Sequence, residues 1–344
     1  MFKTVTISKC RTLVLAFGLI FCSNIIQAQK IVQLQQGKST SIRGLSVVND
    51  KIAWVSGSKG HVALSTDSGK TWNWQQVKGY EQSDFRDVEA FSAKEAIVMS
   101  SGTPAYILKT TDGGATWDLK YKNDDKAYFL DAMDFIGKKH GFILGDPINN
   151  KFLLLETNDA GNTWHPFISQ PDAIAGEAAF AASGTCLRVT NKSIHIVTGG
   201  KVTRSLTCNL KGTKWIANDL PIKHGKDSQG AFSTDQQGFI FVGGDYTKDK
   251  STDSVACYFD RNLSGVYTWL LPINNGPAGY QSCVEEVMDK FFLSTGTSGS
   301  NISTDGGRTW QQIDTISYNV CRKAKKGKLV LLAGDRGKIG ILHF

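Results

Sequence analysis

An eight-residue pattern that returns four times constrains the fold of this chain more than any other feature. Its form is Ser/Thr-x-Asp-x-Gly-x-Thr-Trp, and it occupies residues 65–72, 110–117, 157–164 and 303–310. Two eroded copies, residues 211–215 and 266–269, keep a threonine and the final tryptophan. The six tryptophans follow one another at intervals of 41–54 residues, a spacing typical of the blades of a β-propeller.

The residue types in the pattern are those that a tight turn between two strands requires. The aspartate can accept backbone N–H bonds within the turn, and the glycine can take the positive φ of a hairpin. The threonine opens the next strand, and the tryptophan can pack between neighbouring sheets. We therefore predict a structural role for the aspartates of the four intact copies, Asp67, Asp112, Asp159 and Asp305. Asp-x-Gly also suggests calcium, but the full set of oxygen ligands is missing, so we predict no metal site.

The same four short strands surround each copy. In the second repeat they are predicted at residues 85–91, 96–100, 106–110 and 116–121. The chain ends with three strands of a further repeat, predicted at residues 318–322, 328–333 and 338–344. This last repeat lacks a fourth strand, and residues 30–35 form a spare strand before the first repeat. We predict an all-β, seven-bladed propeller of four-stranded blades over residues 29–344, closed by the N-terminal strand, which removes the exposed edges of an open sheet.

The first 28 residues have the composition of a secretory signal peptide. Lys3, Lys9 and Arg11 precede an apolar stretch at residues 12–22, and Ala28 offers a cleavage point. The apolar stretch is too short for a stable membrane span. We expect a secreted or periplasmic monomer with five cysteines, an odd and widely spaced set that predicts no disulfide framework.

With these repeats the chain resembles the BNR/Asp-box propellers, which include bacterial sialidases, sortilin-type receptors and photosystem II assembly factors. The density of the pattern and the length of the repeats are most similar to the assembly-factor group. The resemblance implies the propeller fold over nearly the whole of residues 29–344. It leaves the activity open, because this scaffold carries unrelated functions.

Propeller geometry indicates where a ligand site would lie. The repeated pattern joins the third and fourth strands of a blade, so the starts of the inner strands open on the opposite face. Polar side chains gather at those starts and in the neighbouring loops. We predict a ligand site formed by Arg43, Arg86, Asp87, Asp131, Asp146, Glu177, Asp245, Tyr280 and Gln281. Two arginines can hold an anion by bidentate bonds, and Asp87, Asp131 and Glu177 are the candidate acid and base residues.

Two functions remain open at this stage. The first is a module that binds a protein or a glycan, including an anionic one. The second is a glycoside hydrolase, either sialidase-like or with paired carboxylates. The chain departs from the sialidase pattern in two ways. Residues 41–44 do not match the Phe/Tyr-Arg-Ile-Pro segment of that family, and no inner strand starts with a third arginine to complete the three that bind the substrate carboxylate. A purely structural role for the polar residues is the third interpretation, because channel mouths are wet. No dinucleotide or zinc-binding spacing occurs, and the net charge of +8 is dispersed, so we expect no cofactor and no nucleic-acid partner.

Overall fold

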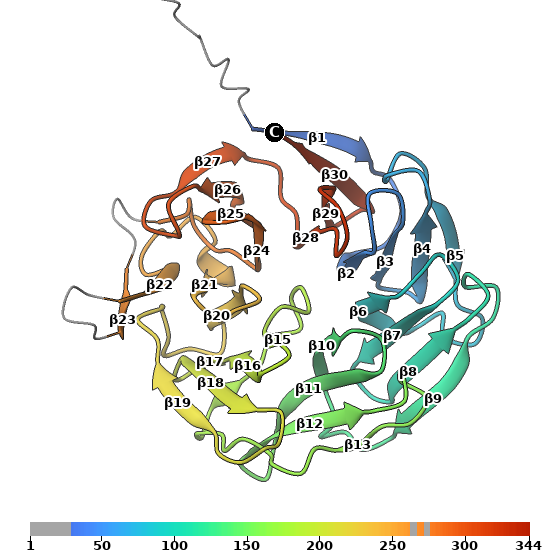
Figure 1. The fold of residues 1–344 in the computed structure, drawn as a ribbon, viewed down its shortest axis with the longest axis horizontal. Coiled ribbons are helices and arrows are strands. Elements are labelled where there is room, and N and C mark those ends of the chain that lie inside the picture. Colours follow the sequence, from blue (N-terminus) through green and yellow to red (C-terminus); the bar gives the residue numbers. More distant parts are fainter. Residues whose placement is uncertain (1–28, 262–266, 272–275) are drawn as a thin grey trace, which may run out of the picture.

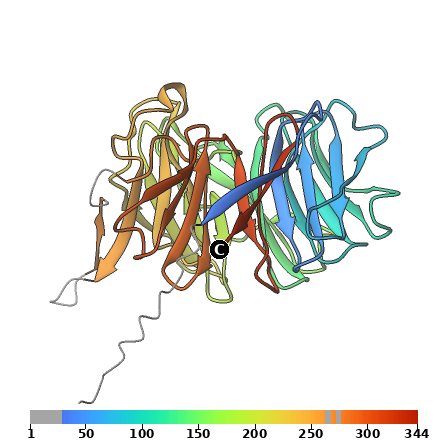
Figure 2. The ribbon, with the colours of Figure 1, turned by 90° about the horizontal axis from the view of Figure 1, so that it is seen from above.

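The computed structural model describes residues 29–261, 267–271 and 276–344, and these residues form seven sheets around a central axis (Figure 1). The predicted all-β, seven-bladed propeller is confirmed. The first strand of each blade lies nearest the axis (Figure 1). Seen from the side, the blades form a single layer around that axis (Figure 2). The predicted signal peptide, residues 1–28, and the start of the last eroded copy, residue 266, lie outside the described residues.

The first three blades each consist of four consecutive antiparallel strands. Blade one contains β2 (Ile42–Val47), β3 (Ala53–Gly57), β4 (His61–Ser65) and β5 (Asn73–Gln76). Blade two contains β6 (Asp84–Ala90), β7 (Ala96–Ser101), β8 (Ala105–Thr110) and β9 (Asp118–Asn123). Blade three contains β10 (Leu130–Ile136), β11 (His140–Ile148), β12 (Lys151–Thr157) and β13 (His165–Pro166).

Blades four and five are less regular. Blade four contains β15 (Leu187–Val189), β16 (Ser193–Val197), β18 (Arg204–Asn209) and β19 (Ile216–Asp219). Blade five contains β20 (Gln229–Thr234), β21 (Ile240–Asp245), β22 (Ala256–Arg261) and β23 (Tyr267–Leu270), with the short 3-10 helix η1 (Tyr246–Lys248) after β21. Two short strands, β14 (Glu177–Ala178) and β17 (Gly199–Gly200), extend the sheet of blade five. The inner strand of blade four therefore begins at Leu187, and the sequence alignment that placed its start at Glu177 was wrong.

The last two blades close the ring as predicted. Blade six contains β24 (Cys283–Met288), β25 (Phe291–Gly296), β26 (Gly299–Ser303) and β27 (Gln311–Asp314). Blade seven contains β28 (Val320–Lys323), β29 (Val330–Gly334), β30 (Lys338–His343) and, from the other end of the chain, β1 (Lys30–Gln35). Strand β1 runs antiparallel to β30, with Lys30 opposite His343 and Gln33 opposite Gly340, and both figures show the two strands side by side.

The repeated turns have the predicted hydrogen bonds. In the third copy, Asp159 Oδ1 accepts the Thr163 N–H at 2.9 Å, and Asp159 Oδ2 accepts the Thr163 hydroxyl at 2.7 Å. Gly161 has a φ of 76°, and an added Cβ would lie 2.3 Å from the Cδ1 atom of Ile97 in the preceding blade. Trp164 packs in the same apolar cluster between blades two and three. The turn therefore fixes the fourth strand of its own blade and the contact with its neighbour.

Polar side chains on or beside the inner strands join every blade to the next. Each one bonds to the main chain of the neighbouring blade, so the junctions resist sliding of one sheet past another. In blade order they are Ser46 to Ala90, Asp87 to Met133, Asp134 to Val189, Arg188 to Thr234, Ser233 to Val284, Glu285 to Lys323 and Asn319 to Ile42.

Candidate functional site

A cavity of about 510 Å³ opens at the end of the axis where the inner strands begin. Six blades and the connection before β15 contribute to its wall, and the structure brings together five of the predicted site residues there. They are Arg43, Arg86, Asp131, Asp146 and Tyr280. The face opposite the repeated turns is thus where the predicted side chains meet.

A β-bulge in the inner strand aims the key side chain of four blades into this cavity. The strand register shifts between Ile42 and Gly44, between Phe85 and Asp87, between Leu130 and Ala132, and between Ala231 and Ser233. The extra residues at these four shifts are Arg43, Arg86, Asp131 and Phe232, all of which line the cavity. A bulge re-aims a side chain that regular pleating would direct elsewhere, and bulges are over-represented next to active sites.

The two arginines differ in how their charge is used. Arg86 Nε forms an ion pair with Asp84 Oδ2 at 2.7 Å, and its guanidinium lies over the ring of Phe129. Arg43 forms no hydrogen bond or ion pair within the described part of the chain. Burial and the neighbouring Arg86 lower the pKa of Arg43, while Asp84 partly offsets that effect. Arg43 therefore presents a half-buried, unpaired cation to the cavity.

Asp131 is the complementary feature. Its side chain is fully buried, and neither carboxyl oxygen accepts a hydrogen bond of normal geometry among the described residues. Burial and the nearby Asp146 carboxyl raise the pKa of Asp131 well above its ordinary value, although Arg86 opposes this. Burial also raises the pKa of Asp146, which accepts the Ala179 N–H at 3.1 Å. A buried polar group left without a partner costs free energy, which a ligand that bonds to Asp131 would recover.

Aromatic side chains form one wall of the cavity, and the sequence analysis identified only Tyr280 among them. Phe180 and Phe232 stack with ring centroids 3.9 Å apart, and Tyr280 meets Phe232 edge-on at 4.8 Å. Tyr246 adjoins this wall, with its ring 6.2 Å from that of Phe232, and Phe129 lines the cavity beside Arg86. Phe129 lies two residues before the predicted Asp131, and Tyr246 directly follows the predicted Asp245, so the positions of the repeat could have identified both. Phe180 lies in the long connection before β15, which does not follow the repeat, so its position could not be predicted from the sequence.

Four of the predicted residues do not line this cavity. Glu177 is buried in an ion pair with Arg204, with Oε2 and Nη2 at 2.5 Å. Asp87 points away from Arg86 and accepts the Val88 and Met133 N–H groups. Asp245 accepts the Thr247 N–H at the start of η1, and Gln281 is buried with its amide bonded to Ser298.

A second cavity, of about 230 Å³, lies where the inner strands end, and the sequence analysis did not predict it. Arg322 and Lys323 of β28 line this cavity, together with Arg188 and Lys325. Lys325 pairs with Glu89, and Arg188 pairs with Glu285 at 2.7 Å, so four of the nine charged side chains that line this cavity are paired with each other.

Two general features concern metals and membranes. Across residues 29–261, 267–271 and 276–344, no three His, Cys, Asp or Glu side chains cluster in a way that could hold a metal ion. In that same part of the chain, no helix has the length and apolar character needed to cross a membrane.

Comparison with protein families gives two matches. Residues 73–177 match the family described as "Photosynthesis system II assembly factor YCF48", and residues 302–312 match the BNR/Asp-box repeat. No curated protein sequence matches the chain.

Solved structures share the fold at low identity. A structure described as "YCF48 bound to D1 peptide" is 17% identical with a TM-score of 0.64, covering 92% of this chain and 97% of that one. YCF48 from Cyanidioschyzon merolae is 16% identical with a TM-score of 0.60, covering 91% and 99%. Virginiamycin B lyase from Staphylococcus aureus is 10% identical with a TM-score of 0.62, covering 92% and 99%. The expected resemblance is thereby confirmed: the chain is a seven-bladed Asp-box propeller similar to the photosystem II assembly factors.

Proposed function

We propose that this propeller acts outside the cytoplasm and binds an acidic segment of a partner protein in the 510 Å³ cavity. The observation that carries the proposal is Arg43, a half-buried guanidinium without a partner in the described residues, set beside an aromatic wall. A guanidinium in that position can form two parallel bonds with a carboxylate. The aromatic rings offer apolar contact area to a neighbouring side chain of the same segment.

The comparisons support a protein as the partner class. The family that matches residues 73–177 is named for an assembly factor, and one similar propeller is described with a bound peptide. A propeller that holds a partner segment during assembly needs a preformed, rigid cavity. Six blades and the connection before β15 contribute to the cavity here, and side-chain bonds fix each blade to the next.

The binding experiment is an array of short peptides of varied acidic content, probed with purified residues 29–344 at low and high salt. Acidic peptides should bind, and Arg43→Lys should bind them about tenfold more weakly, because lysine keeps the charge and loses the planar pair of donors. Arg308→Lys is the matched control, since Arg308 lies in the repeated turn on the opposite face and pairs with Asp260 at 2.7 Å.

Two outcomes would reject this function. One is an Arg43→Lys protein that binds the same acidic peptides as tightly as the wild type. The other is a wild-type protein that ignores peptides and binds on a parallel glycan array, which would make the partner a glycan.

Location outside the cytoplasm rests on residues 1–28, which have the sequence of a signal peptide. Expression of the full chain in a bacterial host should give an exported product whose N-terminus is Gln29. Retention in the cytoplasm with an intact N-terminus would contradict the proposal.

A glycoside hydrolase is the second candidate, and the neighbouring carboxyl groups of Asp131 and Asp146 favour it. Burial raises the pKa of both groups, which is the condition a general acid needs near neutral pH. A screen of fluorogenic glycosides tests this function directly. Hydrolysis that is lost in Asp131→Asn and Asp146→Asn would establish it, and absence of turnover on the whole set would remove it.

A further inference from the structure

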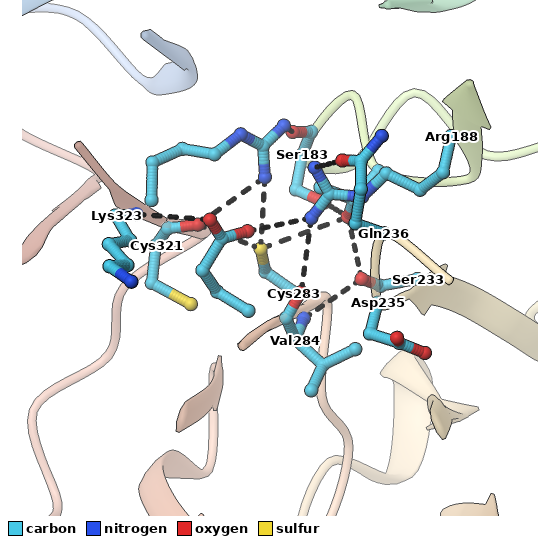
Figure 3. Close-up of polar contacts among 12 residues, drawn as sticks. Ser183, Arg188, Ser233, Asp235, Gln236, Cys283, Val284, Cys321 and Lys323 are labelled. Atoms are coloured by element: carbon cyan, nitrogen blue, oxygen red, sulfur yellow. Dashed lines mark hydrogen bonds and ion pairs between the residues drawn. The ribbon is translucent and has the colours of Figure 1, made fainter. Parts of the chain in front are cut away.

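Two cysteines from neighbouring blades meet near the axis, outside the cavity just discussed. Cys283 begins β24 in blade six, Cys321 lies in β28 of blade seven, and both are fully buried. The Cys283 Sγ lies 3.3 Å from the carbonyl oxygen of Cys321, and the Cys321 thiol lies 3.7 Å from the carbonyl oxygen of Leu293 in blade six. Figure 3 shows the Cys283 sulfur within a polar network that includes the main-chain oxygen of Cys321. The Cys283 sulfur thus contacts Cys321 directly across the junction of the last two blades.

The surroundings of the two sulfurs are unequal. Arg322 Nη1 lies 3.5 Å from Cys283 Sγ, and the Thr185 hydroxyl points to the same sulfur at 3.8 Å. Burial opposes ionisation of Cys283, but the Cys321 thiol and the charges of Arg322 and Arg188 lower its pKa below that of an ordinary thiol. Burial and the neighbouring Cys283 raise the pKa of Cys321. Cys283 is thus the sulfur that loses its proton first, and Cys321 is the one that keeps it.

The other three cysteines have no such environment. Cys186, Cys208 and Cys257 are buried, and the pKa values of Cys186 and Cys257 are raised, chiefly by burial. Each of these two thiols is therefore held in its unreactive, protonated form. The contrast singles out Cys283 and Cys321 within one chain.

Arg322 also connects the thiols to solvent. Its side chain lines the 230 Å³ cavity and contacts the Cys283 sulfur at the same time. Within the described residues Arg322 forms no ion pair with a carboxylate, and its remaining bonds go to main-chain oxygens of Ser183 and Cys321. Arg322 is thus a side chain that contacts both the cavity and the Cys283 sulfur.

We propose that Cys283 and Cys321 form a peroxide-oxidised thiol pair that closes a disulfide between blades six and seven. The Cys283 thiolate attacks one oxygen of hydrogen peroxide, the O–O bond breaks, and hydroxide leaves, giving a sulfenic acid at Cys283. The Cys321 sulfur then attacks the Cys283 sulfur, the S–O bond breaks, and a second water forms with the proton of Cys321. Two thiols and one peroxide thus become one disulfide and two waters.

The first test follows the mass of the native protein during exposure to hydrogen peroxide. The wild type should lose two hydrogen atoms, and peptide mapping should join the peptides that contain Cys283 and Cys321. Cys321→Ser should stop at a sulfenic acid that dimedone traps on Cys283, and Cys283→Ser should form neither product. Cys257→Ser is the matched control and should oxidise as the wild type does.

The second test concerns Arg322. Arg322→Gln should slow formation of the sulfenic acid about tenfold at neutral pH, the effect of one unit of thiol pKa on the thiolate fraction. Arg336→Gln, in an exposed loop of the same blade, should react at the wild-type rate. A thermal melt of each variant verifies folding before the rate is compared.

Three results would overturn the proposal. They are a native protein that keeps all its thiol hydrogens under peroxide, a disulfide that appears only in urea, and an Arg322→Gln variant that reacts as fast as the wild type. The proposal does not depend on the function of the larger cavity, since the two thiols contribute nothing to its wall.

Discussion

The pKa values of two groups of aspartates in this propeller are shifted in opposite directions, and their local surroundings explain the difference. In the repeated turns, hydrogen bonds from Thr71 to Asp67 and from Thr116 to Asp112 lower the pKa of each carboxyl to about 2. In the cavity, burial raises the pKa of Asp131. The turn carboxylates therefore favour folding when ionised, and Asp131 favours it when protonated.

The turn aspartates should make the protein sensitive to acid. Their pKa is lower in the folded than in the unfolded chain, so their contribution to stability is present above about pH 4 and is lost as the pH falls towards 2. The melting temperature should fall through that window. The triple variant Asp67→Asn/Asp112→Asn/Asp159→Asn should have a lower melting temperature than the wild type at neutral pH, and that melting temperature should change less with pH. Asp124→Asn, an exposed aspartate outside the turns, is the control; a triple variant with the wild-type pH profile would contradict the assignment.

Asp131 should give the reverse dependence. Because its pKa is raised in the folded chain, its protonated form stabilises folding at low pH, and stability is lost as the pH rises above the ordinary value of 3.8. Asp131→Asn keeps the shape and removes the titration, so it should raise the melting temperature at neutral pH and change it little near pH 4. The control is Asp118→Asn at the exposed start of β9. A variant less stable than the wild type at neutral pH would mean that Asp131 is ionised and bonded there.

At the scale of the strand, the sequence predicted most positions and missed those set by irregular geometry. The repeat placed β1 at its observed bounds and the second blade to within a few residues. It also put Arg43, Arg86 and Asp131 on one face, because strand starts follow the repeat. It failed at Glu177, since the connection before β15 follows no repeat. It failed at Asp87 because the bulge at Arg86 turns the following side chain away, and no residue pattern marks that bulge.

The junctions between inner strands carry a prediction of their own. Asp134 Oδ2 accepts the Val189 N–H at 2.6 Å across blades three and four, and Oδ1 accepts the Phe135 N–H. Asp134→Ala leaves these donors without a partner, so the free energy of unfolding should fall by about 1–3 kcal/mol. Urea titration measures the loss. Asp118→Ala at the surface is the control and should change the free energy of unfolding by less than about 0.5 kcal/mol. An Asp134→Ala protein as stable as this control would show that the Asp134 bonds do not stabilise the junction.

For the whole molecule, stability depends on how the ring is closed. The junctions from blade one through blade seven join blades that follow one another in sequence. Blade seven, in contrast, joins the two ends of the chain through β1 and β30 and through the bond from Asn319 to Ile42 of blade one. The apolar cluster at this closure includes Ile31 and Leu342 together with residues of blades one and six. Loss of β1 would therefore open the ladder of β30 and expose part of the cluster at the same time.

Deletion of residues 30–35 tests this closure, and the experiment can be made reversible. Without β1, the N–H and C=O groups on the outer side of β30 lose their partners, while those facing β29 keep theirs. Such an exposed edge strand pairs with other chains. The truncated protein should melt at a lower temperature and form oligomers by size-exclusion chromatography. A synthetic peptide with the sequence of residues 30–35 should restore a monomer and raise the melting temperature in proportion to its concentration, because it binds only the folded ring. A scrambled peptide of the same composition should do neither, because register and side-chain alternation select the native pairing. If the truncated protein stays monomeric and melts as the intact one does, blade seven holds together with three strands and β1 is not its closure.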